Sequence, residues 1–420
     1  MKAAVTRPLR AALGLSLAAA AVASAQVASS GVPHDLVGRL PGDAVTRLGI
    51  SATDQRAARP NPLVRYSSMT RFLDRARTVV TGTLDDSTNA VPGSIDVMDA
   101  HGIKATLAVS TQRGPIADLW PRLQAAVENG HEIASHARTH QCQWPDTEAF
   151  CRVAYARDEV DGSRDDILAN TSQPHVWSWV YPCGNCAGYE FVHDRLNQAG
   201  YLVARTYPDE ARGGHLVPNL QTWAPDPYKA DFTQSVQRQG GISPAGRTDV
   251  ALLNRTFDQV HGPPAAAGAG RAAARPSAEG GIYHFVTHPS LLDLGADQFF
   301  AQHLAYIGGR PDVWYVPLGP LYAYQIVRER TVVTPVGAGD GWARFAVHHD
   351  LDPAIYDNAV TLHFVIAAAH GVEVRAGDTP IAVKDTPMTD RWNTQYYRRD
   401  GDATLVTVRP NQIVELRVTP

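Results

Sequence analysis

Short apolar runs alternate with stretches of helical periodicity from about residue 78 to residue 330. The apolar runs have the length and the β-branched content of buried strands, and the stretches between them repeat apolar residues every three or four positions. This alternation predicts a parallel α/β sheet or barrel. The predicted strands are residues 78–84, 104–110, 131–135, 176–181, 201–205 and 282–287, and the predicted helices are residues 94–101, 116–129, 148–169, 191–198, 298–307 and 318–330.

The pattern changes on either side of this region and once within it. Residues 26–76 show little periodicity, so we expect a loosely ordered lead-in. Residues 261–281 are rich in Ala, Gly and Pro, which predicts a flexible surface insertion without chemistry. Short β-branched stretches at 360–366 and 403–409 predict a small all-β module. The expected organisation is an α/β catalytic domain over residues 77–330 and a β-rich domain over residues 331–420.

Residues 1–25 have the pattern of a secretory signal peptide. Lys2, Arg7 and Arg10 precede a short apolar run at 11–21, and the small residues that follow predict cleavage after Ala25. The alternative is an uncleaved anchor, but the apolar run is too short to span a bilayer, and no later run approaches ~20 apolar residues. We therefore expect a secreted protein, extracellular or periplasmic, with no membrane span.

Composition removes several other classes of protein. Among the 420 residues, 44% are hydrophobic and 19% are charged, which excludes a disordered chain or a coiled coil. The chain has 38 Lys and Arg residues against 42 Asp and Glu residues, a net charge of −4, and no long basic run. We therefore expect no nucleic-acid partner.

Export places the four cysteines in an oxidising compartment, where disulfides form. Four cysteines permit three pairings, and the nearest partners along the chain give Cys142–Cys151 and Cys183–Cys186, which we predict. Cys183 and Cys186 also form a CGNC motif, so a redox-active dithiol is the alternative. A structural zinc is disfavoured because the chain has no second CxxC.

Four groups of polar residues each follow a predicted strand. Asp85 and Asp86 follow the strand at 78–84, and His136 follows the strand at 131–135. Residues 181–184 follow the strand that begins at 176, and His288 follows the strand at 282–287. In parallel α/β barrels the active site is built at the carboxyl ends of the strands, so these residues are expected to converge.

His136 and His140 are four residues apart, so on one helical turn both rings would face the same way. With one carboxylate they would form a His-His-Asp metal site with an open position for water, although two surface histidines are the alternative. The adjacent carboxylates Asp85 and Asp86 either lie in a solvated turn or have two different roles in one site. Because successive side chains diverge, one can bind a metal while the other acts as a base.

These motifs resemble, in order, those of the polysaccharide deacetylases, the NodB-homology domains of carbohydrate esterase family 4. TLDDS at 83–87 resembles the family's TFDDG, and SHARTH at 135–140 resembles H-[ST]-x-x-H. YPCGN at 181–185 is similar to the FxYPYGN variant, and FVTHP at 285–289 to the motif in which a strand ends at the catalytic histidine. The resemblance covers about residues 77–330 and implies a distorted (β/α) barrel, followed here by the small all-β module.

The resemblance also assigns roles. It implies that Asp85 is the general base and that a divalent metal, usually zinc, is bound by Asp86, His136 and His140. The backbone N–H of Cys183, in the place of the family's Tyr, would help bind the oxyanion, and His288 would protonate the leaving amine. Tyr181 is a candidate substrate-binding residue.

Several positions depart from the family pattern. Ser87 replaces Gly, Ala137 replaces Ser or Thr, and Val180 stands where a variant of the third motif has Arg. We expect Arg205 to substitute for that Arg, which in the family orients the base, and we also regard Arg205 as a candidate substrate-binding residue. The sequence does not place the family's fourth motif, with its Asp and Trp. Trp223 and Asp226 are the candidates, and Trp223 is also a candidate substrate contact. His284 lies ~13 Å before His288 along its strand, so we expect a buried structural histidine.

The function implied is a secreted, metal-dependent hydrolase that removes N-acetyl groups from an amino-sugar polysaccharide such as chitin, peptidoglycan or an exopolysaccharide. Three alternatives remain open. These alternatives are an O-acetyl esterase acting on a xylan-like glycan, a non-catalytic glycan-binding protein, and a thiol–disulfide oxidoreductase that uses CGNC.

Overall fold

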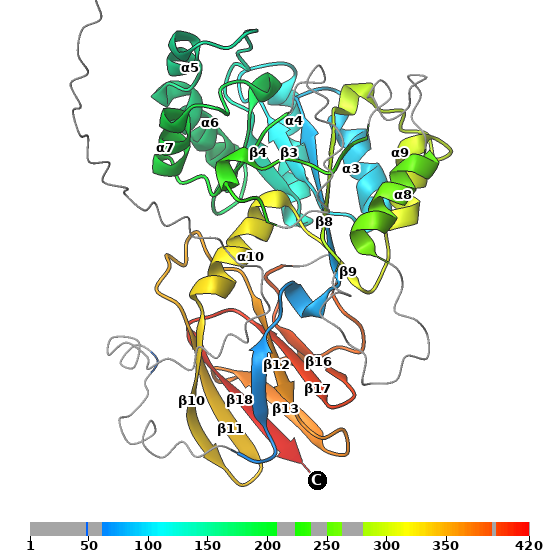
Figure 1. The fold of residues 1–420 in the computed structure, drawn as a ribbon, viewed down its shortest axis with the longest axis vertical. Helices are drawn as coiled ribbons and strands as arrows, with labels where there is room; N and C mark the ends of the chain where they lie inside the picture. The colour runs from blue at the N-terminus through cyan, green and yellow to red at the C-terminus, as the bar shows by residue number, and fades with distance from the viewer. Residues whose placement is uncertain are drawn as a thin grey trace, which may run out of the picture. The chain divides into compact units, whose positions relative to one another are not determined.

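A curled parallel sheet of eight strands organises the first part of the chain (Figure 1). The computed structural model describes residue 48 and residues 61–207, 223–236, 250–262, 280–388 and 392–419. The expected signal peptide, the lead-in up to residue 60 apart from residue 48, and residues 263–279 of the expected insertion lie outside the described residues.

The sheet has the strand order β6-β5-β4-β3-β2-β8-β7, and β9 pairs with β2 off this path. Within the described ranges, the edge strands β6 and β7 do not pair with each other, so the sheet is a curled open half-barrel. The predicted α/β fold of the deacetylase type is therefore confirmed. The strands are β2 (Thr78–Asp85), β3 (Thr106–Val109), β4 (Glu132–Ser135), β5 (Ser178–Val180), β6 (Val203–Arg205), β7 (Gln234–Ser235), β8 (Ile282–Thr287) and β9 (Val313–Tyr315).

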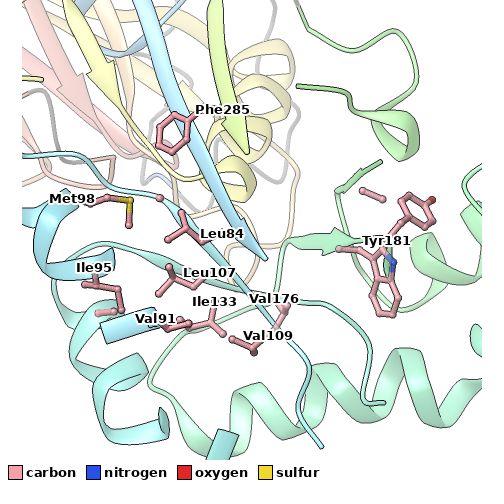
Figure 2. Packing of buried hydrophobic residues seen from close by; sticks show 14 of the residues in the cluster. Leu84, Val91, Ile95, Met98, Leu107, Val109, Ile133, Val176, Tyr181 and Phe285 are labelled. Atoms are coloured by element: carbon pink, nitrogen blue, oxygen red, sulfur yellow. The ribbon is translucent and has the colours of Figure 1, made fainter. Parts of the chain in front are cut away.

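Helices join these strands and cover the sheet. Apolar residues of β2, β3 and β4 share one buried cluster with Ile95 and Met98 of α3 (Figure 2). Each helix in the described ranges is too short or too polar to traverse a bilayer. The helices are α3 (Val91–Ala100), α4 (Ile116–Glu128), α5 (Glu148–Ala154), α6 (Arg157–Asn170), α7 (Glu190–Gln198), α8 (Val250–His261), α9 (Phe299–Ile307) and α10 (Leu318–Arg330).

The single helix expected over residues 148–169 is divided into α5 and α6. The break is at Tyr155, which is 5% exposed and whose hydroxyl donates to the carbonyl of Asn185. Its ring packs against Trp179 and Tyr181. Burying this side chain against β5 turns the chain between the two helices, without the Gly or Pro that sequence reasoning relies on. Sequence analysis also missed α8, β7 and β9.

The C-terminal module consists of two five-stranded sheets, with orders β1-β12-β17-β16-β15 and β10-β11-β18-β13-β14. The all-β character predicted for this region is confirmed. The strands are β1 (Arg65–Met69), β10 (Val332–Gly339), β11 (Trp342–His348), β12 (Val360–Val365), β13 (Gly371–Ala376), β14 (Thr379–Pro380), β15 (Ala382–Val383), β16 (Tyr396–Asp400), β17 (Ala403–Val408) and β18 (Gln412–Thr419).

One strand of this module comes from the lead-in, which contradicts the loosely ordered segment expected up to residue 76. β1 pairs antiparallel with β12, and the Tyr66 ring packs against Phe364 with centroids 5.6 Å apart. Asp74, in the short η1 helix (Leu73–Arg75), is 4% exposed and accepts hydrogen bonds from Tyr396 and Arg398. Contacts hundreds of residues apart order this segment, so local periodicity does not reveal it.

The module meets the barrel at the end opposite to the predicted site residues. Val79 and Ile282, near the starts of β2 and β8, share a buried apolar cluster with Leu362 of β12. The residues predicted to carry chemistry, by contrast, follow the carboxyl ends of the strands. The module therefore supports the barrel from its amino-terminal side.

Candidate active site

The polar residues predicted to converge are brought together at the carboxyl ends of the barrel strands. Asp85 is the last residue of β2, and Asp86 follows it. His136 follows β4, Arg205 ends β6, and His288 follows β8. Parallel pairing places these strand ends on one edge of the sheet, as the fold class requires.

Asp86, His136 and His140 form a cluster whose ligand atoms all lie within 4.8 Å of one another. Oδ1 of Asp86 lies 3.8 Å from Nε2 of His136 and 3.4 Å from Nε2 of His140. The two imidazole rings meet edge to face, with centroids 4.6 Å apart. Ligand bonds of about 2.0–2.2 Å in a tetrahedral zinc site separate ligand atoms by about 3.3–3.6 Å. The donor set therefore fits a zinc-sized cation with little movement.

The environment of His136 suits it to bind a metal. Nδ1 of its ring lies 2.8 Å from the carbonyl oxygen of Val180 and donates to it, which leaves Nε2 facing Asp86 as a lone-pair donor. Burial lowers the pKa of His136 to about 4. The ring is therefore neutral near pH 7, as a metal ligand must be.

His140 is held differently. Burial lowers its pKa, and Nη1 of Arg113 is hydrogen-bonded to its Nδ1. Arg113 lies in the loop that follows the carboxyl end of β3. Its role was not predicted from the sequence, although its position after a strand was a signal that could have revealed it. Its guanidinium restricts the orientation of the His140 ring.

The two histidines are not on a helical turn, which corrects the expectation drawn from their spacing. The chain from 136 to 140 is a loop in which Ala137 and His140 have φ angles of 62° and 55°. Asp86 also has a positive φ of 78°. Non-glycine residues rarely adopt this conformation, and such residues cluster at functional sites.

Glu159 of α6 holds this loop in place. It is 7% exposed, and its Oε2 accepts from the backbone N–H groups of Arg138 and Thr139 at 2.9 and 3.0 Å. Oε1 accepts from the hydroxyl of Thr139. Nothing in the sequence pattern around Glu159 signals this role, because α6 reads as an ordinary polar–apolar helix.

Asp85 is buried beside the three-ligand cluster and is paired with Arg205. It is 2% exposed, Arg205 is fully buried, and Nη2 of Arg205 donates to both carboxylate oxygens. Burial alone would raise the pKa of Asp85, but the charge and the hydrogen bonds of Arg205 outweigh it and hold the pKa below its ordinary value. Asp85 is therefore ionised at neutral pH. Arg205 occupies the position expected of a residue that orients the base.

His288 is placed on the other side of Asp85. Its Nε2 lies 3.8 Å from Oδ2 of Asp85, and its ring meets Tyr207 edge to face at 5.7 Å. The carbonyl of Tyr207 approaches Gly184 so closely that an added Cβ would lie 2.2 Å from its oxygen. Gly184, with φ of 68°, is therefore required beside Cys183, in the turn that follows β5.

His284 is a buried structural residue, as expected. It is 3% exposed, its Nε2 lies 3.3 Å from Oγ1 of Thr83, and its Nδ1 lies 3.1 Å from the carbonyl oxygen of Asp231. Burial lowers its pKa to about 3, so the ring stays neutral.

The structure does not support Tyr181 or Trp223 as a substrate contact. Tyr181 is 1% exposed within the apolar cluster of the barrel, where a polysaccharide cannot reach it (Figure 2). The ring of Trp223 instead packs against Phe72 and Tyr322. A sequence motif gives the position of a residue along the chain but not the direction in which its side chain points.

Asp226, the other candidate for the fourth motif, has a local capping role in the structure. Asp226 caps a short turn at Tyr228 and lies near His193. Asp231 and Phe232 are better placed, because the Phe232 ring packs against Tyr207, and the carbonyl of Asp231 accepts from His284. Asp231 is only five residues from Asp226 in the sequence. The segment has no periodicity that would indicate which of the two side chains points towards the barrel.

The predicted disulfide pairing is wrong as well. The cysteines pair as Cys142–Cys183 and Cys151–Cys186, with no free cysteine among the described residues. Cys151 lies on the inner face of α5, and both it and Cys186 are fully buried, so they meet beneath the surface. The two cysteines of CGNC have different partners. This removes the CxxC disulfide on which the oxidoreductase alternative depends.

Residues 73–204 match the family model described as polysaccharide deacetylase. This segment belongs to the polysaccharide deacetylase family. It contains three of the four motifs that carry the resemblance, and His288 lies beyond it.

Several solved structures are similar to this chain at low sequence identity. A Mycobacterium smegmatis protein assigned to the polysaccharide deacetylases is 13% identical, with 63% of this chain and 96% of that chain covered and a TM-score of 0.41. A family 4 carbohydrate esterase from Streptomyces lividans, in complex with acetate, is 10% identical, with 55% and 87% covered and a TM-score of 0.33. A CE4 family pseudoenzyme from Bacillus anthracis is 14% identical, with 56% and 59% covered and a TM-score of 0.31. No curated protein matches the chain.

Proposed function

We propose that the protein is a secreted, metal-dependent deacetylase that removes N-acetyl groups from an amino-sugar polysaccharide such as chitin, peptidoglycan or an exopolysaccharide. One observation carries the proposal. A buried, ionised carboxylate, Asp85, adjoins a cluster of three metal-ligand side chains, Asp86, His136 and His140. A base beside an open metal site is what the hydrolysis of an unactivated amide requires.

A divalent ion such as zinc would be held by Asp86, His136 and His140 and would supply polarisation of the acetyl carbonyl and acidification of the attacking water. Asp85 accepts a proton from that water as the oxygen bonds to the acetyl carbon. Arg205 keeps Asp85 ionised and orients it. His288 then donates a proton to the nitrogen as the C–N bond breaks. The products are acetate and the free amine.

The developing oxyanion needs a hydrogen-bond donor. We assign this role to the backbone N–H of Cys183, at the turn after β5, where φ is 53°. A backbone donor does not depend on the side chain, so Cys in the place of the family's Tyr is compatible with it. The disulfide to Cys142 ties this turn to the loop that carries His140.

The expected export of the protein is supported by the cysteines. Both disulfides pair residues more than 30 positions apart, at separations of 41 and 35. Disulfides of this kind persist in oxidising compartments. We therefore propose that the signal-peptide pattern directs the chain to the periplasm or the extracellular space, where acetylated polysaccharide is available.

Two other functions fit the same fold. An O-acetyl esterase would use the same residues, because esters and amides share the tetrahedral intermediate, but an alkoxide leaves more readily than an amine. The placement of His288 beside Asp85 favours an amide substrate, because it supplies the proton that an amine requires. A non-catalytic glycan-binding protein is disfavoured by the buried Arg205–Asp85 pair, which costs desolvation and has no role in binding alone.

Acetate release from a panel of acetylated glycans tests the function. The panel contains chitooligosaccharide, peptidoglycan and acetylated xylan, each with the protein as prepared, after chelation, and after zinc is restored. We expect release from an N-acetylated glycan that chelation abolishes and zinc restores. Release that is indifferent to chelation, or release from xylan alone, would contradict the proposal.

A further inference from the structure

The loop after His140 presents an exposed tryptophan, Trp144, four residues from that metal-ligand side chain. The chain has eight tryptophans, and one of them, Trp144, exposes 56% of its surface. Among the described residues its indole makes no hydrogen bond, ion pair or ring contact. Four residues of extended chain span at most about 14 Å, so Trp144 lies near His140.

This exposure is not the result of a loose loop. Cys142 is bonded to Cys183, and the backbone N–H of Gln143 donates to Oδ1 of Asn185 at 2.9 Å. On the other side of Trp144, the side chain of Asp146 accepts from the backbone N–H of Cys186. The loop is therefore fastened to the turn after β5 both before and after Trp144.

Holding an indole ring exposed to water is unfavourable unless the ring has a binding partner. A large apolar surface stays hydrated, although Trp is usually buried or placed at an interface. A fixed ring, by contrast, binds without the entropy loss of ordering a flexible side chain. Both features favour a flat, partly apolar ligand, and the ring face of a pyranose sugar is one.

We propose that Trp144 is a sugar-stacking platform that binds a pyranose ring next to the residue being deacetylated. The inference rests on the proposed function for its substrate class. It also replaces Trp223, whose ring packs against Phe72 and Tyr322, as the aromatic contact of the site. A platform on this loop would make the enzyme prefer oligosaccharides and polymers over single acetylated sugars.

The test compares wild type with Trp144→Ala, Trp144→Phe and Val153→Ala. Val153 is the matched control, because it is an exposed apolar residue, at 62%, nine positions further along the chain. Each protein is assayed on chitooligosaccharides of two to six sugars and on 4-nitrophenyl acetate, which has no sugar to stack.

We expect Trp144→Ala to raise KM for the longer oligosaccharides by about three- to tenfold, the range of one aromatic contact, with kcat nearly unchanged. Activity on 4-nitrophenyl acetate should stay the same, Trp144→Phe should recover most of the affinity, and Val153→Ala should behave as wild type. An unchanged KM for the oligosaccharides would overturn the proposal. So would an equal loss on 4-nitrophenyl acetate, which would show that the substitution disturbs the site itself.

A binding assay separates this inference from the proposed function. Retention of the proteins on insoluble chitin does not depend on catalysis. If wild type releases no acetate from any glycan, the proposed function fails, and weaker retention of Trp144→Ala would still support the platform. Equal retention of Trp144→Ala and wild type would refute it whatever the activity.

Discussion

Arg205 and Asp85 form a buried ion pair in which Nη2 of the guanidinium donates to both carboxylate oxygens. The pair joins the carboxyl ends of β6 and β2, 120 residues apart in the chain. Because Arg205 holds the pKa of Asp85 below its ordinary value, Asp85 keeps its charge down to acidic pH. Asp85 is therefore ionised, and able to accept a proton, over the whole neutral pH range.

Arg205→Met should weaken both the fold and the base. A buried carboxylate without its partner costs about 3–5 kcal/mol of stability. Since burial remains and the largest opposing charge is lost, the pKa of Asp85 should rise, and the acidic limb of the kcat/KM profile should move to higher pH. Urea unfolding and a pH profile measure the two effects. An unchanged acidic limb would show that this limb does not report the ionisation of Asp85, and Asp85 would then not be the base. Arg409→Met is the control, because its partner Asp357 is exposed.

Removal of one metal ligand should remove the metal. His140→Ala leaves two protein ligands, and a site of that kind should lose most of its affinity for zinc. Asp85→Asn should retain the metal, since Asp85 is not a ligand, but lose about 10²-fold or more in rate. Metal analysis of the two purified variants, beside their acetate release, distinguishes ligand from base. Stoichiometric zinc in His140→Ala would refute the assignment.

His288→Ala should affect amides more than esters. An amine leaves poorly unless it is protonated, whereas 4-nitrophenolate needs no proton. We expect deacetylation of chitooligosaccharide to fall by about 10²-fold or more and hydrolysis of 4-nitrophenyl acetate to fall far less. His284→Gln is the control, because His284 is hydrogen-bonded inside the barrel. If His284→Gln abolished deacetylation and His288→Ala did not, the acid would be misassigned.

The two disulfides should differ in what they support. Loops of 41 and 35 residues predict similar losses of stability, about 4 kcal/mol each, when either bond is removed. Cys142→Ser with Cys183→Ser also frees the loop that carries His140, so zinc affinity and kcat should fall at least tenfold. Cys151→Ala with Cys186→Ala should lower the urea midpoint to a similar degree but leave zinc affinity intact. Equal zinc affinities in the two double variants would show that both bonds are merely structural.

Much of this site could be predicted because its residues follow strands. The runs ending at Asp85, His136 and His288 are apolar and bounded by polar residues, so strand ends and their convergence follow from the pattern. The same reasoning placed Arg205 at a strand end, although it did not show the contact with Asp85. β1 and Glu159 could not be found in this way, because long-range contacts alone give them their roles.

The cysteines show where such reasoning stops. Proximity in sequence favoured Cys142–Cys151, but Cys151 faces the core from α5, and its partner is set by the packing of that helix against the turn after β5. The direction in which a side chain points depends on helix phase and on the break at Tyr155, and neither is encoded in spacing. The same limit misplaced Tyr181, whose strand-end position was correctly predicted but whose side chain turns inward.

Buried histidines should make the metal-free fold sensitive to acid. His303 is fully buried between Tyr283 and Asn254, and burial lowers its pKa to about 3, as it does for His284. In the unfolded chain a histidine titrates near ~6.5. Between these two values the unfolded state binds the proton and the folded state does not, so stability is present above ~6.5 and falls as the pH is lowered towards 3.

Each such histidine should therefore cost about 2 kcal/mol of stability between pH 7 and pH 5. Urea unfolding at the two pH values, with chelator present throughout, measures the difference for wild type, His303→Gln and His284→Gln. Each variant loses one titrating group, so its drop between pH 7 and pH 5 should be smaller than that of wild type by about this amount, and the double variant should show the sum. The comparison within each protein cancels the cost of the substitution itself. Identical drops in all four proteins would mean that these rings accept protons in the folded state, and the packing around Tyr283 would then have to open in acid.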